Sequence, residues 1–144
     1  RSLLENSSFI ASSANPDERI HGKGFVARLS GSTAEFLEIW QHMMFGKNFF
    51  ENINDELSLT FRPSIPDYLI PEQLKIETTF LGTIQTVYHL SKKESLIPGK
   101  YAIKEILITD NDGLKKRFQT RLTGEDARNV RDGFVKKIDV FIEQ

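Results

Sequence analysis

The sequence predicts a mainly β chain, in which an antiparallel β-sandwich follows one long apolar helix. Three observations support this fold class. Residues 32–45 carry apolar side chains at helical spacing behind a capping box. From Leu57 onward the apolar period changes from 3.6 to 2, which is the pattern of half-buried strands. Turn-forming residues then divide the chain into short segments, which is typical of a two-sheet sandwich.

The N-terminal residues indicate little regular structure. Residues 1–23 are rich in turn formers, as in the run from Ser12 to Asp17, and predict an ordered loop or a broken strand. Phe9-Ile10 is the clear apolar anchor of this region. Residues 25–27 predict an extended lead into the helix.

The helix is expected over residues 32–45. Ser32 is the predicted N-cap, Glu35 completes the capping box, and Gly46 supplies the stop. Six large apolar residues form a stripe wider than an ordinary amphipathic face: Phe36, Leu37, Ile39, Trp40, Met43 and Met44. Such a helix requires partners on several sides.

Six or seven short strands are expected after a turn at residues 48–54, whose two phenylalanines should tuck into the core. The strands lie at 57–61, 74–80, 84–90, 101–109, 114–120 and 134–142. The apolar parity slips within 101–109, which fits a bulge near Lys104-Glu105 or a strand covered on both faces. Residues 110–113 predict a hairpin turn, and residues 123–132 a short capped helix or turn that Gly133 ends.

Composition limits the classes of function. The 144 residues amount to one domain by size, and the net charge of −1 favours neither nucleic acid nor an anionic membrane. The chain has no cysteine, so it has no disulfide, thiolate nucleophile or cysteine metal site. No apolar run reaches a membrane span and no signal-peptide pattern is present, so we expect a cytoplasmic protein. Because the chain starts at Arg1 rather than Met, we expect a piece of something longer.

No metal site or cofactor is expected. Histidines 21, 42 and 89 are far apart and lack the spacing of a metal site, so each is interpreted as a surface or core histidine. The run 110–113 resembles the opening of a calcium loop, but Gln119 stands where that loop requires glutamate, and a hairpin turn explains it better. The serines before the helix lack the nucleophile elbow of a hydrolase.

The turn before the helix is a candidate anion site. Gly31 permits close backbone approach, and the N–H groups of Ser32, Thr33 and Ala34 are free at a helix N-terminus. Arg28 lies four residues before the cap and could add charge. An ordinary capped helix, whose serines bond their own backbone, explains the same residues from the sequence alone.

Several segments, taken together, resemble the late part of bacterial proteins related to cellobiose phosphorylase, a family of inverting disaccharide phosphorylases. They occur in the same order across almost the whole chain, although each has modest specificity. The segments are residues 12–17, 22–37, 80–82, 87–89, 130–133 and 138–140.

The resemblance implies an architecture and a role. Members of the family carry an N-terminal β-sandwich, a helical linker, an (α/α)6 catalytic barrel and a C-terminal β-domain. Residues 1–50 would then be the end of the barrel, with the helix as its last, and residues 51–144 the C-terminal β-sandwich. The remainder of the barrel and an oligosaccharide are the implied partners, inorganic phosphate is the implied co-substrate, and a homo-oligomer is possible.

The resemblance also implies site residues. Ser30-Gly31 matches in position a small pair that helps to hold phosphate, so Arg28, Ser30, Gly31, Ser32 and Thr33 form the expected phosphate-binding group. The family's general acid lies upstream and has no counterpart here, so no catalytic residue is expected in this chain. Ala34-Glu35-Phe36 departs from the small-plus-tryptophan sequence of cellobiose phosphorylases proper. The identity of the disaccharide therefore stays open, as does the choice between phosphorolysis and hydrolysis.

Two alternatives remain open. The chain could be a stand-alone carbohydrate-binding β-sandwich with Trp40, Tyr68, Tyr88 or Tyr101 as sugar-stacking platforms. It could also be a structural or oligomer-forming module, for which exposed apolar surface on the helix would be the sign.

Overall fold

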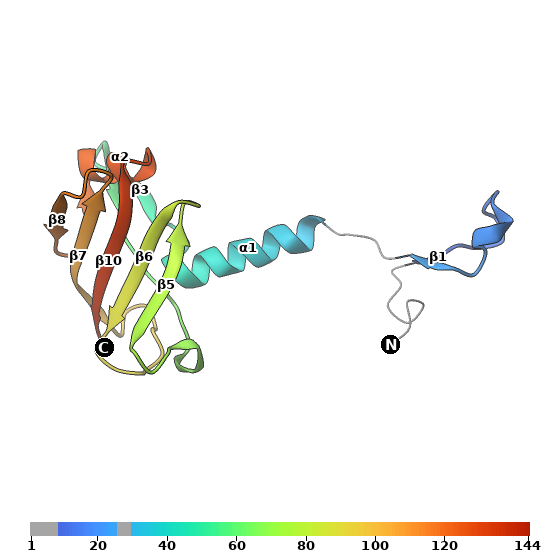
Figure 1. Ribbon diagram of the computed structural model, residues 1–144, viewed down its shortest axis with the longest axis horizontal. Coiled ribbons are helices and arrows are strands. Elements are labelled where there is room, and N and C mark those ends of the chain that lie inside the picture. Colours follow the sequence, from blue (N-terminus) through green and yellow to red (C-terminus); the bar gives the residue numbers. More distant parts are fainter. Residues whose placement is uncertain (1–8, 26–29) are drawn as a thin grey trace. The chain divides into compact units, whose positions relative to one another are not determined.

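The computed structural model describes residues 9–25 and 30–144, with the side chains of the second stretch described from residue 34 (Figure 1). The chain divides into two compact units, Arg1–Leu37 and Glu38–Gln144, and each is described by itself. About 38% of the residues are in strands and 20% are helical. The prediction of a mainly β chain is therefore confirmed.

The first unit contains a small antiparallel ribbon. Strand β1 (Phe9–Ile10) pairs with β2 (Gly24–Phe25), and the Phe9 and Phe25 rings stack with centroids 5.5 Å apart. A 3₁₀ helix, η1 (Glu18–Ile20), lies between the strands in sequence. Asp17 caps it by accepting a hydrogen bond from the Arg19 N–H, and the Arg19 guanidinium binds the same carboxylate. Broken strands and turns are what the many turn formers of this region predict.

Helix α1 (Ser30–Phe45) crosses from the first unit into the second. It begins two residues before the predicted start and ends, as predicted, before Gly46, whose φ is +93°. The expectation of one long, strongly apolar helix is not supported. Both α-helices of the described residues are short, with 16 residues in α1 and 8 in α2 (Gly124–Arg131). Polar residues at Glu35, Glu38 and Gln41 interrupt the apolar sequence of α1.

A five-stranded sheet forms most of the second unit. Its spatial order is β5 (Lys75–Phe80), β6 (Ile84–Leu90), β10 (Val135–Glu143), β7 (Ala102–Asp110) and β8 (Lys115–Phe118). The expectation of a purely antiparallel fold is wrong, because β10 pairs parallel to β6 and antiparallel to β7. After β8, the segment containing α2 returns the chain to the end of the sheet where β7 ends, so β10 enters the centre of the sheet in the direction of β6 (Figure 1).

A second, three-stranded sheet has the order β3 (Phe50–Ile53), β4 (Glu56–Leu59) and β9 (Leu122–Thr123), all antiparallel. The predicted turn at 48–54 is therefore wrong in part, because β3 occupies it. The turn is instead Asn54-Asp55, with φ of +52° and +63°, which are the left-handed angles of a tight hairpin. Phe49 and Phe50 pack against the core, as predicted.

The register of β7 decides between the two explanations of its apolar slip. Glu105 pairs with Phe141 and Ile103 with Ile142, which leaves Lys104 as an extra residue on β7. This is a bulge at the expected position, and it turns Ile103 toward the side that Ile106 occupies.

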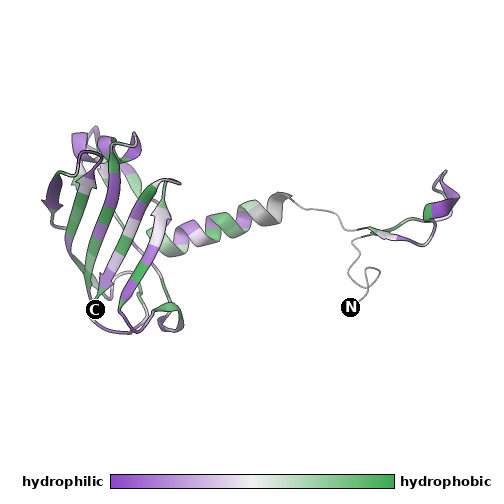
Figure 2. Cartoon of the chain, viewed as in Figure 1, coloured by the Kyte–Doolittle hydropathy of each residue, from purple (hydrophilic) through white to green (hydrophobic). Residues whose placement is uncertain are grey.

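One hydrophobic core joins residues of both sheets with the last turn of α1 and the inner side of α2. Along the strands, hydrophobic and hydrophilic residues alternate (Figure 2). The connection between β4 and β5 contains the 3₁₀ helix η2 (Asp67–Leu69). Among the described residues, no helix has both the length and the hydropathy needed to span a bilayer.

Candidate functional site

The predicted phosphate-binding residues lie at the start of α1. Ser30, Gly31, Ser32 and Thr33 form its first turn, and Arg28 lies outside the described residues. Because the helix begins at Ser30, Ser32 lies inside the helix. The prediction of Ser32 as the N-cap is therefore wrong. The first four N–H groups of an α-helix have no partner within the helix. The anion site at this position remains a prediction.

The opposite end of α1 is bonded into the second unit. The carbonyl oxygens of Met43, Met44 and Phe45 accept hydrogen bonds from the Ser64 N–H (2.8 Å), the Tyr88 hydroxyl (2.6 Å) and the Arg62 N–H (3.0 Å), respectively.

These carbonyls belong to the last turn of a helix, where they have no partner within the helix. Three partners from outside the helix therefore complete the backbone bonding of this end. The Phe45 ring lies in a cluster of phenylalanines whose nearest ring centroid, that of Phe80, is 4.7 Å away. The last turn of α1 is thus part of the core of the second unit.

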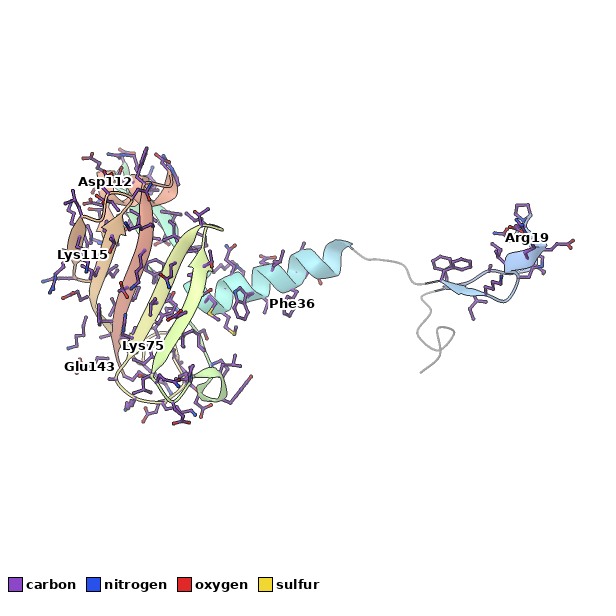
Figure 3. All side chains as sticks on the ribbon, viewed as in Figure 1. Arg19, Phe36, Lys75, Asp112, Lys115 and Glu143 are labelled. Atoms are coloured by element: carbon purple, nitrogen blue, oxygen red, sulfur yellow. The ribbon has the colours of Figure 1, made fainter. Side chains whose placement is uncertain are left out.

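The middle of α1 has the opposite environment. Phe36, Leu37, Ile39 and Trp40 are 67%, 62%, 64% and 42% exposed. Figure 3 shows the Phe36 side chain projecting from the helix. Burying a large apolar side chain is favourable by about 1.5–3 kcal/mol, so the four side chains form an exposed apolar surface whose burial would be favourable.

Two of the four possible sugar-stacking platforms are not available. Tyr88 is fully buried, and burial raises the pKa of its hydroxyl well above the ordinary value. Tyr101 donates a hydrogen bond from its hydroxyl to the Pro63 carbonyl at 2.8 Å, and burial raises its pKa as well. Both rings therefore serve the fold. Tyr68, at 80%, and Trp40 are exposed.

A polar cluster lies on the five-stranded sheet between β6 and β10. The Asp139 carboxylate accepts hydrogen bonds from His89 Nε2 at 2.8 Å and from Lys137 Nζ at 3.0 Å, and the His89 ring stacks on Phe141. Burial alone would raise the pKa of Asp139, but the His89 and Lys137 bonds outweigh it and leave the pKa lowered. His89 was predicted to be a surface or core histidine, and its role is to bond the nearly buried carboxylate of Asp139.

The other candidate metal ligands have structural partners. His21 Nε2 bonds the Asn15 carbonyl at 2.8 Å, and His42 lies 3.7 Å from Glu38. Asp110 Oδ1 accepts the N–H groups of Asp112 and Leu114, so residues 110–113 form the predicted hairpin turn. No three His, Asp or Glu side chains within the described part of the chain gather as a metal site.

A cavity of about 680 Å³ lies between the β7–β8 hairpin and helix α2. Strand β7, the hairpin turn, β8, α2 and the start of β10 all contribute to its lining: Ile108, Asp110, Asn111, Asp112, Leu114, Lys115, Lys116, Glu125, Asp126, Asn129, Phe134 and Val135. Sequence analysis identified the turn and the helix but not their proximity. The one sequence feature that could have indicated the cavity is Phe134, a large apolar residue directly after Gly133, where the helix has ended.

Comparisons of the chain with protein-family models, with curated proteins and with solved structures found no match. The resemblance to the cellobiose phosphorylase family therefore rests on the segments quoted above, and the function has to be argued from residues and geometry.

Proposed function

We propose that this chain is the C-terminal part of a carbohydrate-active enzyme, namely a disaccharide phosphorylase related to cellobiose phosphorylase or a glycosidase of similar architecture. In this proposal the second unit is a scaffold. It holds α1, the last helix of a catalytic barrel, whose first turn supplies one edge of the phosphate and sugar site. The chain alone carries no catalytic group and turns over no substrate.

The bonding of the last turn of α1 is the observation that supports the proposal best. Three consecutive carbonyls of this turn are bonded from two segments of the second unit, the stretch that follows β4 (Arg62 and Ser64) and strand β6 (Tyr88). Several hydrogen bonds to one helix end hold that end in a fixed orientation relative to the β-sheets. A C-terminal β-domain that has to position a barrel helix needs such a junction.

The exposed middle of α1 supports the same assignment. Phe36, Leu37, Ile39 and Trp40 cover more than one side of the helix, since consecutive positions differ by about 100° around its axis. A helix with apolar residues on more than one side belongs against several neighbours rather than at a free surface. The neighbouring helices of a barrel would supply them.

The proposed phosphate edge is the first turn of α1 with Arg28. An anion at a helix N-terminus accepts hydrogen bonds from free N–H groups and is stabilised by the helix dipole. Gly31 leaves the backbone open to close approach. Each charge-assisted hydrogen bond to phosphate would contribute about 1.5–3 kcal/mol.

The test uses the complete polypeptide that contains this chain, assayed for phosphorolysis of cellobiose and related disaccharides. Gly31→Val should raise the Michaelis constant for phosphate at least about tenfold, because the side chain blocks one or more backbone hydrogen bonds. Gly99→Val, at a loop glycine outside the proposed site, is the control: it strains the local backbone at φ +89° but meets no atom within 4 Å, and it should leave the constant unchanged.

Two results would contradict the proposal. Absence of phosphorolysis and of glycoside hydrolysis in the complete polypeptide would remove the enzyme assignment. If Gly31→Val left the Michaelis constant for phosphate unchanged, the enzyme assignment would stand, but the first turn of α1 would be an ordinary helix start without a phosphate site.

A further inference from the structure

We infer that the cavity between the β7–β8 hairpin and α2 is a binding site for a neutral saccharide, separate from the phosphate edge at the start of α1. The choice of ligand class rests on the proposed function, and the site itself rests on the cavity. Its volume of about 680 Å³ lies in the range of small-molecule sites, which is about 300–1,000 Å³.

The cavity has an apolar base and apolar rims. Ile108 and Val135, at 5% and 3% exposure, are core residues that also line it. Leu114 and Phe134, at 71% and 59% exposure, come from the hairpin and from the turn after α2. An exposed aromatic ring beside a hollow offers a face on which the C–H groups of a pyranose ring can stack.

An ion pair crosses from the hairpin to α2. Lys116 Nζ lies 2.7 Å and 2.6 Å from the two carboxylate oxygens of Asp126, and the same ammonium lies 5.4 Å from the centre of the Phe118 ring. The pair satisfies both charges and ties the hairpin to the helix. The pair therefore bridges two walls of the cavity, at a position where Lys116 is largely exposed.

The remaining polar groups are mostly acceptors. Within the described part of the chain, the carboxylates of Asp112 and Glu125 have no hydrogen-bond or ion-pair partner, and both line the cavity. Figure 3 shows Asp112 at the end of the sheet where α2 lies. Sugar hydroxyls donate to such carboxylates, and the Asn129 amide can both donate and accept.

The charge of the lining argues against an anionic ligand. Four carboxylates (Asp110, Asp112, Glu125, Asp126) face two ammonium groups (Lys115, Lys116), and Asp126 already neutralises Lys116. A phosphate or a uronic acid would meet net negative charge. A neutral ring with hydroxyl donors on its rim and C–H groups on its face matches the lining best.

The test is a titration of the ¹⁵N-labelled 144-residue chain with cellobiose and cellotetraose, followed by NMR. Amide shifts should concentrate in residues 108–116 and 125–135. Phe134→Ala should weaken the affinity about tenfold, because it removes the stacking face at an exposed position. Tyr68→Ala removes another exposed aromatic side chain, one that does not line the cavity, and should leave the affinity unchanged.

Each contrary outcome overturns the inference in a distinct way. Saccharides that shift no amides of the cavity exclude the site. An affinity that Phe134→Ala leaves unchanged, or that Tyr68→Ala weakens about tenfold, places binding elsewhere. Choline that shifts the cavity amides while saccharides do not identifies a site for cations. None of these outcomes depends on phosphorolysis, so the cavity can fail while the enzyme assignment stands, and the reverse.

Discussion

The last turn and the middle turns of α1 carry similar residues in opposite environments. Phe45 is 4% exposed within a cluster of aromatic rings, whereas Phe36, two and a half turns earlier, is 67% exposed. The last turn also has its carbonyls bonded from outside the helix. The difference teaches that the second unit builds the last turn of the helix into its core, whereas the middle turns contribute little to that core.

The largest expected effect comes from truncating the buried phenylalanine. Phe45→Ala should lower the free energy of unfolding by about 3–5 kcal/mol, because it removes a core ring and leaves a cavity. Phe36→Ala is the matched control on the same helix and should change the free energy by less than about 0.5 kcal/mol. Urea denaturation of both variants measures the two values. Equal losses would show that the middle of α1 is as much part of the fold as its end.

The helix stop should give the next largest effect. Gly46 has φ of +93°, and a Cβ atom there would lie 2.9 Å from the Arg62 Cβ and 3.1 Å from the Arg62 carbonyl oxygen. Gly46→Ala should cost about 2–4 kcal/mol, since it combines backbone strain with overpacking. Gly99→Ala has similar strain, at φ +89°, but no atom within 4 Å, so it should cost only about 1 kcal/mol. A cost for Gly46→Ala no larger than that of the control would mean that Arg62 moves aside freely.

The smallest effect concerns one hydrogen bond and its pH dependence. Tyr88→Phe leaves the Met44 carbonyl without its partner and should cost about 1–3 kcal/mol at pH 7. Tyr68→Phe, at an exposed position, should cost nothing measurable. Unfolding in urea compares the two variants under the same conditions.

The pH dependence follows from the raised pKa of Tyr88. Below pH 10 the hydroxyl is protonated in both states, so the full stability is present. Above pH 10 the unfolded state ionises first, and stability falls until the pH passes the pKa of the folded state. Tyr101 contributes in the same direction, so Tyr88→Phe should make the alkaline loss shallower rather than abolish it. An alkaline profile identical in the variant and the natural chain would contradict this account.

Periodicity predicted the second unit well where strands pair with sequence neighbours. The β5–β6 and β7–β8 hairpins, the turn at 110–113 and the stop at Gly46 all follow from local rules. The bulge at Lys104 was visible as a slip in apolar parity. These features depend on a few adjacent residues, and such signals are strong in a single sequence.

The features that sequence analysis missed depend on long-range pairing. The parallel contact of β10 with β6 joins residues about fifty positions apart, and no local signal marks it. Residues 48–54 predict a turn because asparagines are turn formers, and Asn54 does lie in the turn, whereas Asn52 is held in β3 by pairing with Leu57 of β4. The cavity was missed for the same reason, since it forms only when the hairpin and α2 are brought together.

Strand β10 is the last of the five strands in sequence but the central one in space. As the polypeptide leaves the ribosome, the β5–β6 and β7–β8 hairpins can each close early, yet β6 and β7 then present bare edges toward each other. Nothing joins the hairpins in one sheet until β10 is inserted between them. From the completion of β7 until β10 is synthesised, the nascent second unit therefore exposes two unpaired strand edges, and the last strand to be made completes the sheet.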